Sequence, residues 1–180
     1  MIFERLDSHA ICQQCGFELW EPIAKSIHTN LGLYNDDRFP GRCILSLGEH
    51  RDSLESLPMD TIMGFLRDIQ IAMKAIRQAN NATRVNVAIL GNRETHLHAH
   101  LIPRFPEDEQ FPDCSPWNDL RPKGKLPREK VECLKKDIFE KIKEIDTRVE
   151  KVAAQGDKNE QGELMDRNLS LLASCLVDEY

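Results

Sequence analysis

The spacing of apolar side chains changes along the chain from strand-like to helical and back. Residues 25–34 and 42–50 alternate between apolar and polar positions, which predicts two strands. In residues 58–79 apolar side chains recur every three or four positions, which predicts a long amphipathic helix. Two further strands are predicted over residues 85–90 and 95–105, and the short loop between them is typical of a hairpin.

The second half of the chain continues with a loop and two helical segments. Residues 106–126 are rich in proline and acidic side chains, which predicts a long loop, and residues 127–151 have helical spacing. The composition then becomes that of a linker, followed by a last amphipathic helix over residues 163–177. We therefore expect one main domain over residues 1–150, followed by a linker and an amphipathic helix over residues 151–180.

This order of elements predicts an α+β fold. Its centre is an antiparallel β-sheet with a long helix between strands and a C-terminal helix packed on it. On the strand over residues 42–50, Cys43, Leu45 and Leu47 share one face and are expected in the core. The apolar face of the first helix is expected to consist of Ile62, Leu66, Ile69, Met73 and Ile76.

The composition narrows the class of partner. The chain has 180 residues, 41% of them hydrophobic and 30% charged, which is enough apolar material for a real core. Its formal net charge of −6 argues against a nucleic acid polymer, because such binding needs a basic surface. A small phosphorylated ligand is not excluded, because it needs only a local cluster of donors.

The chain carries no segment that predicts export or membrane insertion. No run approaches the roughly 20 apolar residues that span a bilayer, and the first residues contain acidic side chains, so a signal peptide is not expected. We therefore expect a cytoplasmic protein. In that compartment the six cysteines are expected to be thiols or metal ligands, and not a disulfide framework.

Half of the six histidines lie within five residues, at His96, His98 and His100. On a strand they point the same way, while Leu97, Ala99 and Leu101 point into the core. Three imidazoles on one face have three interpretations. They are a polar sheet face, or ligands of one metal ion, or a nucleophilic site in which one imidazole is assisted by its neighbours.

Residues 91–104, which contain His96-Leu97-His98-Ala99-His100, resemble the signature of the histidine triad superfamily. The segment over residues 40–50, PGRCILSLGEH, looks like that family's Pro-Gly strand ending in histidine, and a long helix follows it as in the family. Residues 86–92 and Pro116-Trp117 look like a bacterial branch that acts on diadenosine polyphosphates. The resemblance covers roughly residues 10–145 and implies the family's α+β fold.

The resemblance implies a nucleotide hydrolase or nucleotidyltransferase. His98 is then the nucleophile, which attacks the α-phosphorus of a dinucleoside polyphosphate or a nucleoside phosphoramidate and forms a covalent nucleotidyl intermediate. His100 donates to the phosphate oxygens. Asn92, which stands where the family usually has glutamine, is implied as a further catalytic residue that binds a phosphate oxygen. Asn35 and Trp117 are implied in substrate binding, although Asn35 also fits an ordinary turn and Trp117 an ordinary surface loop. No catalytic cofactor is expected, and family members usually form homodimers.

Two other functions remain open at the level of sequence. The fold also occurs in chains that would bind a nucleotide or act as a scaffold without catalysis. Alternatively, all three histidines of the triad bind one metal ion in a metal-dependent enzyme.

The Cys12-x-x-Cys15 pair is by itself a weak motif, because thiols at this spacing also serve redox chemistry. A structural zinc site needs four nitrogen or sulfur ligands. The family resemblance nominates Cys12, Cys15, His50 and His96 for such a site. It would then assign His96 to zinc and His98 to chemistry, and reduced free thiols are the alternative.

Overall fold

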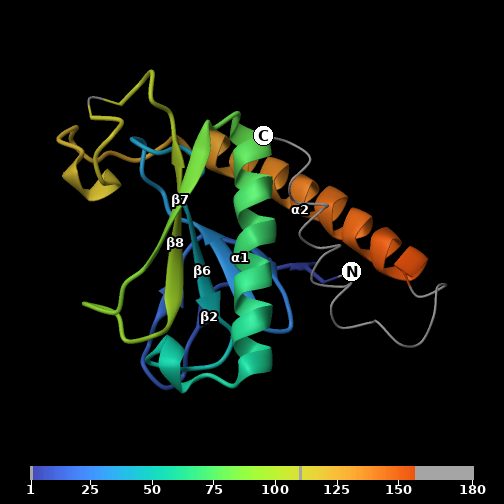
Figure 1. Ribbon diagram of the computed structural model, residues 1–180. Coiled ribbons are helices and arrows are strands. Elements are labelled where there is room, and N and C mark those ends of the chain that lie inside the picture. Colours follow the sequence, from blue (N-terminus) through green and yellow to red (C-terminus); the bar gives the residue numbers. More distant parts are fainter. Residues whose placement is uncertain (1, 110, 157–180) are drawn as a thin grey trace.

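The computed structural model describes residues 2–109 and 111–156 (Figure 1). A six-stranded antiparallel sheet forms its centre, in the order β1-β4-β5-β6-β8-β7. The predicted α+β class is confirmed. The strands of this sheet are β1 (Glu4–Arg5), β4 (Pro22–Lys25), β5 (Thr29–Leu33), β6 (Cys43–Leu47), β7 (Arg84–Ile89) and β8 (His98–Arg104).

The remaining elements are a small hairpin and the helices. Strands β2 (Ala10–Ile11) and β3 (Glu18–Leu19) pair with each other, and α1 (Met59–Asn80) lies between β6 and β7 in the chain. Helix α2 (Arg128–Gly156) follows the long loop after β8, and both helices lie on one side of the sheet (Figure 1). Short 3₁₀ turns are η1 (Leu54–Ser56) and η2 (Pro116–Asn118). None of the helices that the structure describes combines the length and the apolar character needed to cross a membrane.

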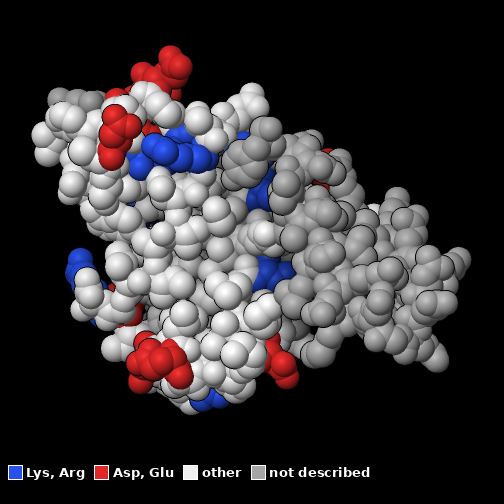
Figure 2. All heavy atoms as spheres, in the orientation of Figure 1, with Lys and Arg blue, Asp and Glu red and all other residues white. Residues whose placement is uncertain are grey.

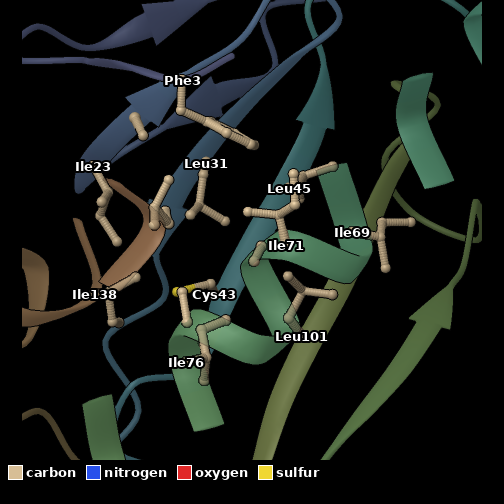
Figure 3. Packing of buried hydrophobic residues seen from close by; sticks show 14 of the residues in the cluster. Phe3, Ile23, Leu31, Cys43, Leu45, Ile69, Ile71, Ile76, Leu101 and Ile138 are labelled. Carbon is tan, nitrogen blue, oxygen red and sulfur yellow. The ribbon is translucent and has the colours of Figure 1, made fainter. Parts of the chain in front are cut away.

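The core lies between the helices and one face of the sheet (Figure 3). Cys43, Leu45 and Leu47 of β6 all belong to it, as the alternation predicts. The apolar face of α1 is rotated from the predicted one, because Phe65 is fully buried and its neighbour Leu66 is 45% exposed. The prediction for Leu66 was therefore wrong: an adjacent helical position lies about 100° away around the axis, and the larger aromatic ring occupies the core.

The single strand predicted over residues 25–34 is in fact the end of β4, a turn and β5. The Ser26 hydroxyl accepts hydrogen bonds from the backbone N–H groups of His28 and Thr29, each at 3.0 Å, and so reverses the chain. The apolar alternation continues through this turn, and no glycine or proline marks it. The hairpin was therefore missed.

Two other element ends differ from the predictions. Strand β8 begins at His98 and not at residue 95. The N–H of Leu97 donates to the backbone oxygen of Arg51, beyond the end of β6, and its own oxygen accepts from Leu47, the last residue of β6. Helix α2 continues to Gly156, through Ala153, Ala154 and Gln155, which favour helix. The domain boundary predicted at residue 150 thus falls within α2, and the helix predicted over residues 163–177 lies outside the described residues.

The face of the sheet away from the helices is partly covered by the β2–β3 hairpin. Leu19 of β3 packs where Gly32 of β5 has no side chain, since a Cβ there would lie 2.5 Å from the Leu19 Cγ. The loop of this hairpin carries Cys12 and Cys15. The N-terminal cysteine pair is therefore held on the same face of the sheet as the side chains of the triad.

Candidate active site and metal centre

The triad histidines occupy the face of β8 that is turned away from the core. His98 pairs with Ser46 and His100 with Ile44 of β6. The intervening residues Leu97, Ala99 and Leu101 all belong to the core, so the predicted division of faces is confirmed. The rings of His98 and His100 are 4.9 Å apart between centroids and nearly perpendicular.

The proton on His98 is located by one short hydrogen bond. Its Nδ1 lies 2.7 Å from the backbone oxygen of His96. A carbonyl oxygen only accepts, so Nδ1 carries a proton, and in the neutral ring Nε2 carries the free electron pair. The residue is 5% exposed, so its surroundings hold the ring in this orientation. In its neutral form His98 therefore presents an oriented Nε2 with a free electron pair.

His100 has the opposite tautomer. Its Nδ1 lies 3.4 Å from Nη2 of Arg42, and a guanidinium only donates, so the proton of His100 is on Nε2. Burial lowers the pKa of His100 to about 4, and the charges of Arg42 and His98 act in the same direction. At neutral pH this side chain is an uncharged N–H donor beside His98.

Trp117, a predicted substrate-binding residue, lies against His100. The two rings are 5.6 Å apart between centroids in an edge-on arrangement, and the indole is half exposed. The loop that carries it is fastened by the buried Arg104, which pairs with Glu109 and donates to the backbone oxygens of Pro112 and Cys114 at 3.0 and 3.1 Å. The indole is thereby kept next to the triad.

The two predicted asparagines occupy different surroundings. Asn92 is exposed in the loop between β7 and β8, and no described residue forms a hydrogen bond with its side chain. Asn35 bonds to Leu126 at both ends of its amide: Oδ1 accepts from the backbone N–H at 2.8 Å and Nδ2 donates to the backbone oxygen at 3.4 Å. Asn35 thus fastens the segment before α2. A role of either asparagine in substrate binding stays a prediction.

The four residues nominated for zinc come together. One potential ligand atom from each of Cys12, Cys15, His50 and His96 lies within 4.8 Å of all the others. They come from the β2–β3 loop, the segment after β6 and the segment before β8. Tetrahedral zinc, with bonds of about 2.0–2.3 Å, separates its ligand atoms by roughly 3.3–3.8 Å. The cluster is therefore of the right size and donor type for that ion.

In both imidazoles of this cluster Nε2 is engaged by an oxygen, which leaves Nδ1 available for a metal ion. His96 donates from Nε2 to the Leu47 oxygen at 2.9 Å, and its Nδ1 is 3.6 Å from the Cys15 Sγ. His50 likewise uses Nε2 to contact Asp52 at 2.9 Å, while its Nδ1 is buried without a hydrogen-bond partner. Burial also lowers the pKa of His96, which favours its neutral form. A bonded Nε2 and a free Nδ1 are typical of metal-ligating histidines.

Phe17 connects the cysteine pair to the triad histidines. Its ring stacks on His96 at a centroid distance of 4.8 Å and an angle of 17°, and it lies 5.4 Å from the ring of His98. The chain therefore places an aromatic ring, two residues after Cys15, against both a candidate ligand and the candidate nucleophile.

The alternative in which all three triad histidines bind one ion is not favoured. The metal-ligating cluster found among residues 2–109 and 111–156 does not include His98 or His100. The guanidinium of Arg42 lies beside His100, and a cation at that position repels a divalent ion.

Comparisons with solved structures identify the fold family. No model of a protein family matches the chain, and no curated protein matches it either. Among solved structures, a histidine triad protein of Sinorhizobium meliloti is 23% identical with a TM-score of 0.61, over 67% of this chain and 88% of that one. A histidine triad protein of Marinobacter aquaeolei is 22% identical with a TM-score of 0.61, over 69% and 89% of the two chains. The chain has the histidine triad fold.

A zinc-bound protein with the histidine triad fold is also similar. It comes from Mycobacterium smegmatis, is 17% identical and has a TM-score of 0.51, over 71% of this chain and 86% of that one. At these identities the likeness concerns the path of the chain. The side-chain chemistry of the site rests on the geometry described above.

Within its histidine triad fold, this chain carries a charged group that the sequence analysis did not single out. Asp36 is fully buried and accepts from Arg38 at 2.8 and 2.9 Å and from Arg42 at 3.0 Å. Although burial opposes ionisation, hydrogen bonding to Arg38 and the charges of both arginines lower the pKa of Asp36. The available signal was an acidic residue followed by arginines two and six positions later, directly before strand β6.

Proposed function

We propose that this chain is a nucleotide hydrolase or nucleotidyltransferase of the histidine triad type. Its substrate would be a small nucleotide with a phosphoric anhydride or a phosphorus–nitrogen bond at the α-phosphorus. The observation that carries the proposal is the tautomer of His98, because Nδ1–H bonds to the His96 oxygen and leaves Nε2 free. Oriented neutral imidazole is a good nucleophile at neutral pH.

In the proposed reaction Nε2 of His98 forms a bond to the α-phosphorus, and the bond to the leaving group breaks with its electron pair. The His96 carbonyl stabilises the positive charge that develops on the imidazole, because the Nδ1–H bond strengthens. His100 would donate Nε2–H to a phosphate oxygen as its negative charge increases. Water then forms a bond to phosphorus and releases a proton, while the phosphorus–nitrogen bond breaks and returns the electron pair to Nε2. The net hydrolysis product is the free nucleotide.

We also propose that Cys12, Cys15, His50 and His96 hold a structural Zn²⁺. The proposal is supported by the partnerless buried Nδ1 of His50 and by the convergence of the four ligand atoms. When bound, the ion would crosslink the β2–β3 hairpin to the segment before β8. The bond to phosphorus and the hydrogen bond to the phosphate oxygens would remain with His98 and His100.

The experiment that tests the catalytic proposal offers the protein diadenosine tetraphosphate or adenosine phosphoramidate and measures AMP release. Mass spectrometry of protein quenched in acid during turnover should detect a nucleotidyl adduct on His98. His98→Ala should abolish both signals. His9→Ala is the matched control, because His9 is an exposed histidine paired with Glu18 and should leave turnover unchanged.

The rival functions give different results in the same assay. A non-catalytic binding protein would bind nucleotide without releasing AMP. A metal-dependent site would lose all activity when a chelator removes the ion. The proposed mechanism instead requires that chelated protein continues to release AMP as long as it stays folded. Full turnover in His98→Ala would show that another group is the nucleophile.

The partner predictions are tested separately. On the face shown in Figure 2, lysine and arginine side chains form separate groups and no continuous stripe, which supports a small ligand over a nucleic acid polymer. We propose a homodimer as the assembly. Light scattering coupled to size-exclusion chromatography should give twice the chain mass, and a monomer mass would contradict it.

A further inference from the structure

Arg42 is a buried cation whose charge is only partly compensated. It is 8% exposed, and the carboxylate that it contacts, Asp36, is already held by two hydrogen bonds from Arg38. One negative charge is thus shared by two guanidinium groups. Burial lowers the pKa of Arg42 against the opposing effect of Asp36, although a guanidinium remains protonated in proteins. The trio keeps a net positive charge.

Part of the Arg42 side chain also lacks a partner. Its Nε is buried without a hydrogen bond, while Nη1 and Nη2 contact Asp36 and His100. A buried donor without a partner destabilises a protein, because its bonds to water are lost and not replaced. A purely structural ion pair would be expected to satisfy this group. The arrangement is instead typical of a site whose remaining partner is a ligand.

Arg42 extends the row of groups that begins at the nucleophile. Side chains of β6 and β8 on the open face follow the register Ser46–His98 and Ile44–His100. Arg42 lies directly before β6, two residues from Ile44, and continues this alternation. Its contact with His100 brings the guanidinium next to the candidate phosphate site. The Cys/His cluster lies at the other end of this row, beyond His98.

Aromatic rings and a second cation flank this end of the row. The Arg42 guanidinium carbon is 4.3 Å from the ring centroid of Tyr34 and 5.8 Å from that of Trp117. Lys123 lies 4.4 Å from the same Tyr34 ring. The adjacent Asp119 is engaged by Arg121. Beyond His100, the site therefore offers positive charge and planar surfaces together.

We propose that Arg42 is a phosphate-binding residue, which with Lys123 binds the ionised phosphates next to the one attacked by His98 and so selects phosphoric anhydrides over phosphoramidates. This inference deepens the proposed function and rests on it for the identity of the attacked phosphate. A phosphoramidate of a nucleoside monophosphate has one phosphoryl group. A chain of phosphates has anionic oxygens within reach of both cations.

The test measures binding and turnover independently. Isothermal titration of the full-length, zinc-loaded protein with inorganic pyrophosphate and with adenosine requires no catalysis. Arg42→Gln should weaken pyrophosphate binding about 10- to 100-fold, the usual effect of losing a charged hydrogen bond, and should leave adenosine binding unchanged. Arg67→Gln is the matched control, because Arg67 also contacts a buried aspartate, Asp68, but lies on α1. Equal pyrophosphate affinity in Arg42→Gln and the wild type would overturn the proposal.

A second variant tests whether Arg42 binds phosphate if Arg42→Gln does not fold. Asp36→Asn keeps the size of the side chain and removes its charge, which frees Arg42 for an anion. It should tighten pyrophosphate binding severalfold, whereas a structural role for the Asp36–Arg42 pair predicts equal or weaker binding. Either of these latter results would overturn the proposal.

Turnover then tests the choice of substrate. In Arg42→Gln, kcat/KM for diadenosine tetraphosphate should fall at least tenfold more than kcat/KM for adenosine phosphoramidate. Equal losses would refute the selectivity. If the wild type binds pyrophosphate through Arg42 but turns over neither nucleotide, the proposed function fails while the anion site stands.

Discussion

The ring of Phe17 stacks almost parallel on the imidazole of His96, with centroids 4.8 Å apart. The same ring also lies against His98. The cysteine loop therefore contacts the triad histidines through an aromatic side chain as well as through the candidate zinc ligands. This contact places the candidate nucleophile and the candidate zinc site in one packed unit.

Replacing Phe17 by alanine should reduce kcat with little change in KM. Aromatic pairs contribute about 0.5–1.5 kcal/mol beyond their buried area, which corresponds to a loss of roughly 2- to 10-fold if the pair orients His98. Steady-state kinetics on the zinc-loaded protein measures the effect. Phe17→Tyr retains the ring and should restore the rate, and an unchanged kcat in Phe17→Ala would show that the stack does not position His98.

Replacing Asp52 by asparagine should weaken zinc binding about 10- to 100-fold, because the carboxylate orients His50 through its Nε2. Competition with a chromogenic chelator measures the affinity. A double variant tests the ligand set directly. Cys12→Ser/Cys15→Ser should lose zinc altogether. Cys114→Ser, at an exposed thiol outside the cluster, should keep the wild-type zinc content. Unchanged zinc in the double variant would exclude the proposed ligand set.

The stability of the protein should fall as the pH is lowered from 6.5 to about 4, in part because of His100. In the unfolded chain this side chain takes up a proton near its ordinary pKa of 6.5, whereas burial keeps the folded value at about 4. Between these values the unfolded state binds more protons, so the free energy of unfolding rises with pH. The free energy of unfolding therefore decreases as acid is added.

Chemical denaturation at several pH values measures this slope. His100→Asn has no imidazole to titrate, so its unfolding free energy should depend less steeply on pH between 4 and 6.5 than that of the wild type. Identical slopes in the two proteins would mean that His100 has an ordinary pKa in the folded state.

Replacing Glu109 by glutamine should release the loop that carries Trp117. Arg104 and Glu109 are both buried, and removing one partner of a buried ion pair typically costs about 3–5 kcal/mol. We expect a lower melting temperature, faster proteolysis within residues 106–126 and a raised KM. Asp113→Asn, at an exposed residue of the same loop, is the control. A melting temperature equal to that of the wild type would contradict this role of the ion pair.

The sequence alone determined the class of fold and the face of the sheet on which the triad histidines lie. Alternation over residues 42–50 and helical spacing over residues 58–79 are local properties, and β6 and α1 follow them closely. The same alternation separates His98 and His100 from Ala99, because successive side chains of a strand point to opposite faces. The turn at Ser26 was missed because it depends on side-chain-to-backbone hydrogen bonds.

Only the tertiary structure decided how the distant residues are brought together and which ring nitrogens their neighbours engage. The tautomers of His98 and His100 are set by the His96 carbonyl and by Arg42, and the meeting of Cys12 with His50 and His96 depends on the hairpin that covers Gly32. Burial then lowers the pKa of His100, an effect that cannot be predicted from the composition of the chain. The sequence supplied the reactive groups because residue type and strand period are local, and the fold supplied their environment because hydrogen bonds and desolvation arise from contacts across the chain.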